Sequence, residues 1–375
     1  MKQIKKTVLF ILHIPPPVHG SSIVGKQIMD SEMINSKFTT TYINLGTSKN
    51  VNDIGGWDFK KTIIYLRILF SILKKVIRSE YDLVYIAPTV SNFGFYKDFV
   101  VVFIVKLFQK KIIFHLHNKG VSQRNKNLIN NFLYRFAFKS VDVILLSRLL
   151  YKDICEFVKE DCIHICPNGI EIIPNLEIEL SKKSKNEVPT ILFLSNLIES
   201  KGVFVLLEVL NNLQKRGFDF ICNFVGGIGD ITEVSFNNKV KYFELEKNVY
   251  YLGKKYDKEK FDIFSNSDIF ILPTFNDCFP LVLLEAMQFR LPLISTYEGA
   301  IPEIIEDGVN GFLLKQKNID TLTSKLEILI SDKQLMLKMG EAAYEKYIKN
   351  YRLEIFESNM FKILNKSLIK NEKVF

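Results

Sequence analysis

Hydrophobic residues along the chain form short continuous runs that alternate with stretches of helical period. Runs at 7–14, 83–87 and 269–272 predict strands that are buried on both faces. Apolar positions spaced three and four apart predict helices between them, most clearly at 60–78 and 203–216. Strands that alternate with helices indicate parallel sheets wound on both faces, an α/β fold.

The succession of elements occurs twice. In the first half, we expect strands at 7–14, 40–43, 83–87, 111–115, 141–146 and 162–166, and helices at 21–31, 60–78, 97–108 and 128–138. In the second half, we expect strands at 190–195, 218–225, 249–252, 269–272 and 291–296, a glycine turn leading into one more strand, and helices at 203–216, 258–265, 281–287, 319–330, 332–350 and 353–370. The polar, lysine-rich stretch 171–189 is the best candidate for a linker. We therefore predict domains at 1–170 and 190–350, followed by residues 351–375.

Composition agrees with two globular domains. The chain has 375 residues, of which 47% are hydrophobic and 31 are Phe, enough apolar surface for two cores. Because no apolar run reaches 18 residues, a membrane span is not expected. The apolar stretch 7–14 follows Lys5 and Lys6, but it is short and ends in three prolines without a cleavage site. We read it as a first strand and expect a cytoplasmic protein.

The cysteines do not indicate a disulfide framework, because five are scattered through a long chain. Cys162-Ile-His-Ile-Cys166 places three possible metal ligands on one face of a strand. The spacing matches no common zinc pattern, and a fourth ligand is not evident. Buried strand residues are the favoured interpretation, with a metal site as the alternative.

The excess positive charge lies in the first half. Residues 1–180 hold 24 Lys and Arg against 15 Asp and Glu, whereas residues 181–375 hold 26 of each. In the helix expected at 60–78, the basic residues fall within an arc of about 140°, opposite Leu66, Leu69, Phe70, Leu73, Val76 and Ile77. These basic residues are Lys60, Lys61, Arg67, Lys74, Lys75 and Arg78. A second basic and aromatic segment spans 124–139.

Three interpretations of these segments remain open. The lysines are solvated on a core-facing helix, or they contact an anionic membrane surface, or they bind nucleic acid. A membrane surface would attract each basic residue by roughly 1 kcal/mol. No zinc finger or RNA-binding signature is present. We favour peripheral contact with an anionic membrane and expect no nucleic acid partner.

The most informative stretch is Asp277-Cys-Phe-Pro-Leu-Val-Leu-Leu-Glu285, which follows the strand at 269–272 and opens an apolar helix. Backbone N–H groups around 279–282 lack partners at the start of that helix and favour an anion or a sugar oxygen. One carboxylate precedes the helix and one lies within it, so together they can hold two hydroxyl-bearing parts of a ligand. The alternative is a capping Asp277 and a solvated Glu285.

This stretch resembles the E-x7-E signature of the retaining glycosyltransferases of family 4, with Asp277 in place of the first glutamate. The following residues 297–312, including Glu298-Gly-Ala-Ile-Pro-Glu303, also resemble the family's pattern. The resemblance covers nearly the whole chain and implies the GT-B fold, two Rossmann-like domains that face each other across a cleft. In that fold the last helix, here 351–375, crosses back onto the first domain.

The resemblance also implies roles for second-domain residues. Lys201, before Gly202, would neutralise the diphosphate. Asn196, where the family usually has arginine, would bind the donor through a hydrogen bond but without a charge. Gly226 and Gly253 belong to segments that resemble those lining the nucleotide. Glu285 would bind the ribose and Asp277 a sugar hydroxyl, and the sugar would meet backbone groups of Phe279, Pro280 and Leu281.

In the first domain, Pro15-Pro-Pro-Val-His-Gly-Ser-Ser22 resembles the family's glycine-rich first loop, with His19 where glycine is common. Gly20 and Ser21 would approach the donor there. His117, at the end of the strand 111–115, is by resemblance the histidine that contacts the transferred sugar. Lys119 and Arg124 are weaker candidates for acceptor contacts. Only one glycine of a G-x-G-x-x-G pattern is present, which disfavours NAD.

We therefore expect a retaining glycosyltransferase with His117, Lys201 and Asp277 as catalytic residues. Its donor is expected to be a nucleoside diphosphate sugar, with UDP as the favoured nucleotide, and its acceptor a lipid-linked or growing cell-surface glycan such as a capsule, O-antigen or exopolysaccharide. Because no Asp-x-Asp occurs, we expect neither a metal nor another cofactor. The alternatives are an enzyme of this class with a soluble acceptor and a non-catalytic sugar-nucleotide-binding protein.

Overall fold

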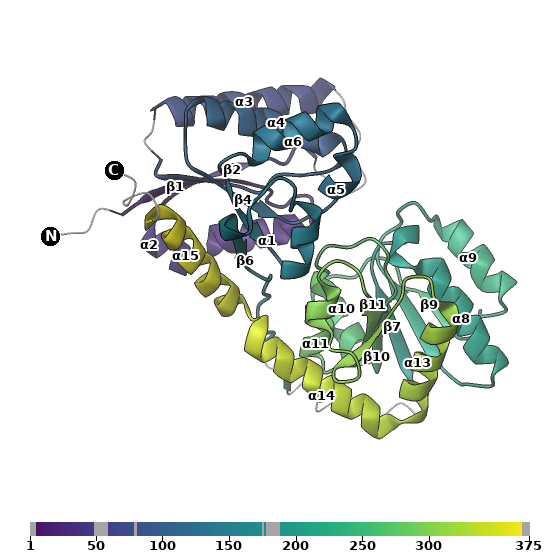
Figure 1. Cartoon of the computed structure of the whole chain (residues 1–375). Coiled ribbons are helices and arrows are strands. Elements are labelled where there is room, and N and C mark those ends of the chain that lie inside the picture. The colour runs from purple at the N-terminus through teal and green to yellow at the C-terminus, as the bar shows by residue number, and fades with distance from the viewer. Residues whose placement is uncertain (1–4, 49–58, 79–80, 175, 178–187, 370–375) are drawn as a thin grey trace. The chain divides into compact units, whose positions relative to one another are not determined.

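The computed structural model describes residues 5–48, 59–78, 81–174, 176–177 and 188–369. The chain divides into two compact units (Figure 1). The first unit combines residues 1–168 with residues 354–375, and the second unit contains residues 169–353. Most of the linker expected at 171–189 lies outside the described residues.

The first unit is built on a six-stranded parallel sheet in the order β2-β1-β3-β4-β5-β6. Its strands are β1 (Thr7–Leu12), β2 (Thr39–Asn44), β3 (Leu83–Ile86), β4 (Ile112–Leu116), β5 (Asp142–Leu145) and β6 (Ile163–Ile165). Every residue of β3, β4 and β5 is buried, as apolar runs covered on both faces should be.

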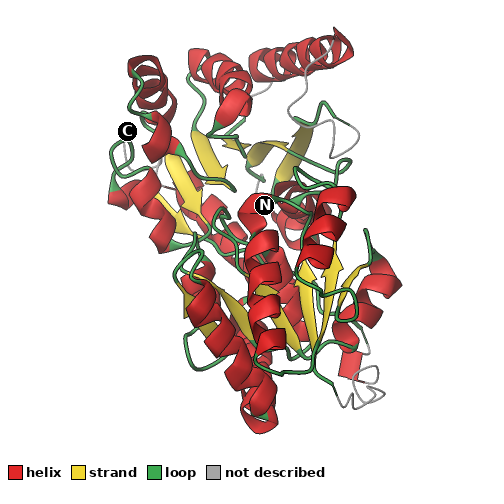
Figure 2. Cartoon of the chain, turned by 90° about the vertical axis from the view of Figure 1, so that its right-hand side faces the viewer, coloured by secondary structure: helices red, strands yellow, loops and turns green. Residues whose placement is uncertain are grey.

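Helices cover both faces of this sheet, with α3, α4 and α6 on one side and α1 and α15 on the other (Figure 1). The helices are α1 (Gly20–Asp30), α2 (Glu32–Lys37), α3 (Phe59–Arg78), α4 (Asn92–Leu107), α5 (Val121–Arg124), α6 (Leu128–Phe138) and α15 (Leu353–Ile369), with 3-10 turns at η2 (Arg148–Asp153) and η3 (Glu160–Cys162). Figure 2 shows helices on both sides of the strands in each unit.

The helix α15 is part of the first unit although it comes last in the sequence. It buries Phe356, Met360 and Leu364, and the Ser367 hydroxyl donates to Asp142 Oδ2 of β5 at 3.3 Å. The Lys111 ammonium, just before β4, donates to the Ser367 carbonyl. The first unit therefore takes its core from both ends of the chain.

The second unit has its own six-stranded parallel sheet in the order β12-β11-β10-β7-β8-β9. Its strands are β7 (Thr190–Leu194), β8 (Ile221–Val225), β9 (Val249–Tyr251), β10 (Ile269–Leu272), β11 (Leu293–Thr296) and β12 (Gly311–Leu314). Its helices are η4 (Glu199–Lys201), α8 (Val203–Lys215), α9 (Glu233–Tyr242), α10 (Asp257–Ser265), α11 (Leu281–Gln288), α12 (Ile301–Ile304), α13 (Ile319–Ser331) and α14 (Lys333–Asn350). The helix α8 packs against α13, and α11 packs against α14.

The predicted elements are present, with differences at their ends. The helix α4 begins at Asn92, five residues before the predicted start at 97, and β8 begins at Ile221 rather than at 218. The helices α2 and α9 were not predicted, because each is short and mostly polar. In α9 only Phe236 and Val240 are buried, too few to create a visible period.

Candidate functional site

The strand order of the second sheet locates a candidate site. From β7 the chain runs outward to β8 and β9, and then to β10, β11 and β12 on the other side. The carboxyl ends of β7 and β10 therefore flank the point where the strand order reverses. Open α/β sheets bind ligands at that point. The loop after β7 carries Lys201, and the loop after β10 carries Asp277.

These two loops bring Lys201 and Asp277 together. The Lys201 ammonium lies 2.5 Å from Asp277 Oδ2, and the two side chains are 22% and 15% exposed. Asp277 Oδ1 accepts from the Cys278 N–H at 2.9 Å. The two loops are also joined by the Phe275 N–H, which donates to the Ser200 carbonyl at 2.8 Å. A cation and a carboxylate are thus held at one edge of the sheet.

Two glycines permit this close approach of the loops. Gly202 has φ +85°, and a Cβ there would lie 2.3 Å from the Pro273 carbonyl oxygen. Gly299 has φ +54°, and its Cβ would lie 2.5 Å from the Asp277 carbonyl oxygen. A side chain at either position would push the loop after β10 away. Backbone conformation, and not only side-chain chemistry, therefore positions Asp277.

The helix α11 begins beside Asp277 without a side-chain cap. Phe279 and Pro280 are buried, and Leu281 opens the helix, so its first N–H groups keep the positive end of the helix dipole. Glu285 lies one turn further on, where its Oε1 is 2.9 Å from the Lys260 ammonium of α10. The sequence reasoning missed Lys260, which is 25 residues away from its partner.

The ends of β8 and β9 bring the two predicted nucleotide segments together. The Gly226 N–H donates to the Gly253 carbonyl at 2.9 Å, and the Tyr251 hydroxyl donates to the Gly226 carbonyl at 2.9 Å. Gly226 has φ +149°, and a Cβ there would lie 2.0 Å from the Ser195 carbonyl oxygen. These contacts leave little space for any residue larger than glycine at position 226.

Asn196 lies beside the same segment. Its Oδ1 accepts from the Gly227 N–H at 2.9 Å, which leaves Nδ2 as the donor of this side chain. A Cβ on Gly227 would lie 3.0 Å from Asn196 Oδ1 and 3.3 Å from the Lys254 ammonium nitrogen. The Lys254 ammonium therefore lies near Asn196, the residue that stands in place of the expected arginine. Its role could not be read from the sequence, because 58 residues separate the two positions.

Glu298 is a further residue whose role the sequence reasoning missed. It is buried, and its Oε1 accepts from the Asp277 N–H at 3.1 Å. Its Oε2 accepts from Gln316 Nε2 at 2.6 Å. The Glu298 carboxylate therefore fixes the position of the Asp277 N–H. A continuous series of contacts runs from Gln316 through Glu298 and Asp277 to Lys201.

A second candidate site lies in the first unit, again where the strand order reverses. Here the loop after β1 meets the loop after β3, and they line a cavity of about 520 Å³. Its lining includes His13, His19, Ser21, Ser91 and Lys97. Ser21 was predicted to contact the donor, and His19 Nδ1 lies 3.1 Å from its hydroxyl.

Gly20 is the first residue of α1, but the protein itself does not require glycine there. A Cβ on Gly20 would meet no atom within 4 Å, and its φ is not in the left-handed region. The close approach predicted for Gly20 is therefore not made by other atoms of the chain. The space beside it is open to a ligand.

His117 follows β4, and its ring lies 4.1 Å from the ring of His115. His117 Nδ1 is buried and has no hydrogen-bond partner among the described residues. Burial, together with His13 and His19, lowers the pKa of His117 to about 3. Burial likewise lowers the pKa of His19 to about 4. At neutral pH each of these rings is uncharged, with one ring nitrogen that can donate a hydrogen bond and one that can accept a hydrogen bond.

The lowered pKa values predict a pH-dependent stability. Between pH 6.5 and about 4 the unfolded chain binds protons at His19 and His117 that the folded protein does not bind, so the free energy of unfolding falls as the pH falls through this window. We expect His117→Gln to have a flatter profile, because one of these groups is removed. Thermal unfolding midpoints at pH 8 and pH 5 measure this. Parallel profiles of the two proteins would contradict the assignment.

Lys119 and Arg124 lie in and after the loop that leaves β4. The carboxylate of Asp153 accepts from the N–H groups of Gly120, Val121 and Ser122 at 2.8 to 3.1 Å, so the start of α5 is already capped. The Arg124 guanidinium donates to Asn92 Oδ1 at 2.5 Å. Because Asn92 lines the same cavity as Ser21, Arg124 lies beside this cavity of the first unit.

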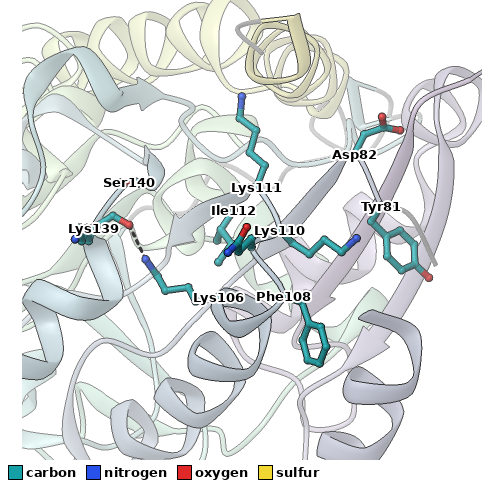
Figure 3. Close-up of a pocket in the computed structure, with 10 residues that line it drawn as sticks. Tyr81, Asp82, Lys106, Phe108, Lys110, Lys111, Ile112, Lys139 and Ser140 are labelled. Atoms are coloured by element: carbon teal, nitrogen blue, oxygen red, sulfur yellow. Dashed lines mark hydrogen bonds between the residues drawn. The ribbon is translucent and has the colours of Figure 1, made fainter. Parts of the chain in front are cut away.

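Two other features lie apart from the residues described above. Cys166 is buried, with its thiol 3.9 Å from the Phe356 carbonyl, and the described residues contain no group of three or more His, Cys, Asp or Glu that could hold a metal. A hollow of about 550 Å³ is lined by Lys106, Lys110 and Lys139 (Figure 3). It lies where β3 and β4 begin, at the edge of the sheet opposite to the histidines.

Part of the chain matches a known family. Residues 176–346 match the family described as Glycosyl transferases group 1. An uncharacterized glycosyltransferase of Haemophilus influenzae is 31% identical over 169 residues, which are 45% of this chain and 47% of that protein. The amylovoran biosynthesis glycosyltransferase AmsK of Erwinia amylovora is 28% identical over 247 residues, which are 64% of this chain and 58% of that protein. The chain thus spans about half the length of the first relative and less than two thirds of the second.

The fold is also found among solved structures. The Anabaena protein HepE, solved in complex with UDP, superposes with a TM-score of 0.74 and 15% identity, over 96% of this chain and 100% of that one. At this identity the likeness shows the fold alone. The predicted GT-B fold, with two Rossmann-like domains, is confirmed, whereas membership of family 4 stays a prediction.

Proposed function

We propose, from the premise that residues 176–346 form a glycosyl transferases group 1 domain, that this chain transfers a sugar from a nucleoside diphosphate sugar to an acceptor hydroxyl. The observation that carries this proposal is the Lys201–Asp277 pair beside the uncapped start of α11. One ammonium, one carboxylate and free backbone donors at a topological switch point suit a ligand that is both anionic and rich in hydroxyl groups.

Each part of the donor has a group to meet it. Lys201 and the start of α11 neutralise charge that develops on the departing diphosphate. Asp277 accepts from a sugar hydroxyl, and Glu285 accepts from the ribose hydroxyls, because a carboxylate has several acceptor positions. The ends of β8 and β9, at Gly226 and Gly253, border the nucleotide. Asn196 carries no charge, and Lys254 is proposed to supply the second cation instead.

A UDP-sugar donor and a glycan acceptor are the favoured substrates. HepE was solved with UDP, and AmsK is named for the biosynthesis of the polysaccharide amylovoran. We propose by this likeness a UDP-sugar and a lipid-linked or growing cell-surface glycan, in the cytoplasm. Arg124, beside the cavity of the first unit, and Lys119 are proposed to contact the acceptor, and His117 the transferred sugar.

The transfer is proposed to retain configuration. The bond from the anomeric carbon to the diphosphate oxygen breaks, and a bond to the acceptor oxygen forms on the same face. The acceptor proton passes to the departing phosphate oxygen. Lys201 and the α11 N–H groups stabilise the charge on that leaving group, so no metal ion is required by the proposal.

A panel of nucleotides and nucleotide sugars, measured by thermal shift in the presence of EDTA, tests the donor. We expect UDP and one UDP-sugar to raise the unfolding midpoint by several degrees. At about 100 times the dissociation constant, binding adds about 2.7 kcal/mol to the free energy of unfolding. UMP and uridine should give smaller shifts, because they lack the diphosphate that meets Lys201.

Two outcomes would contradict the proposal. Absence of any shift with all nucleotides tested would remove the donor site. A shift with a UDP-sugar, but no release of UDP with any acceptor mixture, would indicate a binding protein without transferase activity. Configuration at the anomeric carbon of the product, measured by NMR, tests the retaining course.

A further inference from the structure

The helices α3, α4 and α6 form one layer on a face of the first sheet (Figure 1). The Tyr65 hydroxyl of α3 donates to the Lys97 carbonyl of α4 at 2.6 Å. The rings of Phe103 in α4 and Phe136 in α6 lie 5.7 Å apart. The three helices therefore pack side by side, and each has an outer surface that the sheet does not cover.

The rest of the first unit covers only part of the apolar side of α3. Its fully buried residues are Ile72 and Val76, on the side that faces the rest of the unit. Leu66 and Phe70, which lie opposite the basic arc, are 58% and 68% exposed. Five of the six exposed apolar residues of α3 fall on one stripe of the helix at spacings of three, four and seven. These five are Phe59, Ile63, Leu66, Phe70 and Ile77, and the sixth, Ile64, lies on the basic side.

Neighbouring helices extend this exposed surface. In α4 the exposed apolar side chains include Val100, Phe103 and Leu107, and in α6 they are Leu128, Ile129 and Phe132. We call these residues, with the exposed stripe of α3, the α3–α4–α6 face. Scattered apolar side chains are ordinary on a protein surface, but a set on three adjacent helices marks an interaction site.

The charged residues of α3, α4 and α6 are basic with one exception. They contain nine Lys and Arg residues: Lys60, Lys61, Arg67, Lys74, Lys75, Arg78, Lys97, Lys106 and Arg135. Their single acidic residue is Asp98, which is buried and accepts from the Thr89 N–H at 2.8 Å. On α3 the basic arc borders the exposed apolar stripe. No exposed carboxylate of these three helices would repel an anionic surface.

We infer that the α3–α4–α6 face docks on an anionic membrane surface, with its apolar side chains inserted among the lipids and its basic side chains at the headgroups. This arrangement is that of amphipathic helices lying in the membrane interface. The proposed contact is peripheral. Within the part of the chain that the structure describes, none of the helices has the length and apolar character of a membrane span. A second copy of the chain is a poorer partner, because two such faces would bring basic arcs together.

The hollow in Figure 3 extends the basic border of this face. Lys106 lies in the last turn of α4, and its ammonium donates to the carbonyl of Lys139, the residue after α6, at 2.5 Å. Burial and the neighbouring Lys139 lower the pKa of Lys106 to about 8. A phosphate headgroup beside these lysines would raise the pKa of Lys106 again, because a nearby anion favours the charged ammonium.

Flotation with lipid vesicles tests the inference on the whole chain. We expect binding to phosphatidylcholine vesicles that contain about one third phosphatidylglycerol, and little binding to phosphatidylcholine alone. Replacing four basic residues (Lys60→Gln, Arg67→Gln, Lys74→Gln and Arg78→Gln) should weaken binding about a hundredfold or more. Leu66→Ser with Phe70→Ser should weaken it about tenfold or more.

A matched control uses α14 of the second unit, where Lys333, Leu337 and Lys338 are exposed. Lys333→Gln, Leu337→Ser and Lys338→Gln together should leave vesicle binding unchanged. All substituted side chains reach solvent, and unfolding midpoints check that each variant is folded.

Three results would overturn the inference. They are absence of binding to anionic vesicles, equal binding by the four-charge variant, and full affinity of the Leu66→Ser, Phe70→Ser variant. A concentration-dependent dimer that the apolar variant dissociates would assign the face to a second copy instead. Because vesicle binding needs no nucleotide sugar, this test stands or fails separately from the proposed function.

Discussion

Replacing Lys201 by methionine is expected to lower kcat for sugar transfer by about a hundredfold to a thousandfold, the cost of removing a donor aimed at developing negative charge. Methionine keeps much of the length and the apolar stem of lysine and removes only the ammonium. The effect should appear in kcat more than in the KM of the donor, because charge on the diphosphate grows as the bond breaks. Steady-state kinetics with the donor found by thermal shift measures both constants.

A double variant separates this role from a structural one. Lys201 lies 2.5 Å from Asp277, so Lys201→Met also leaves a carboxylate without its cation. If that were the whole effect, adding Asp277→Asn would restore activity. We expect no restoration, because both residues have their own part in binding the donor. Arg216→Met, which breaks the ion pair of Arg216 with Glu327 at 2.6 Å, is the control for loss of an ion pair elsewhere in the same unit.

Replacing Glu285 by alanine is expected to lower kcat/KM for the donor by about a hundredfold or more and to leave the unit folded. Two hydrogen bonds from ribose hydroxyls to one carboxylate would be lost, each worth roughly 1.5 to 3 kcal/mol. Binding of UDP should weaken in parallel, and thermal shift with UDP measures this directly. Activity near the original level would show that Glu285 does not hold the ribose.

The ion pair with Lys260 offers the matched control for Glu285. Lys260→Met removes the partner 2.9 Å away but keeps the carboxylate. We expect this variant to keep most of its affinity for UDP. If Lys260→Met were as damaging as Glu285→Ala, the ion pair itself, rather than ribose recognition, would explain both losses.

The sequence predicted the fold well where apolar runs were unbroken. Runs such as 269–272 are buried on both faces and have one interpretation, so β10 was predicted with its bounds. Short polar helices such as α9 have no comparable pattern. The apolar side of α3 could be identified from the sequence, but the groups that contact it could not. Periodicity shows which side of a helix is apolar and does not show what covers it.

The candidate site could be predicted only in part for a related reason. A loop that follows a strand of a parallel sheet lies at its carboxyl edge, so Lys201 and Asp277 could be assigned to one edge although 76 residues separate them. Contacts of Lys260, Lys254 and Glu298 depend on how loops pack over that edge. No local pattern marks these residues, since Lys254 and Lys260 resemble any lysine near the start of a surface helix.

The place of α15 has a consequence for synthesis of the protein. Residues 354–369 complete the core of the first unit, yet the ribosome makes them after the whole second unit. At about 5 to 20 residues per second, the nascent first unit waits on the order of ten to forty seconds for its last helix. During that time the surface that will bind Phe356 and Met360 is exposed to chaperones and to other nascent chains.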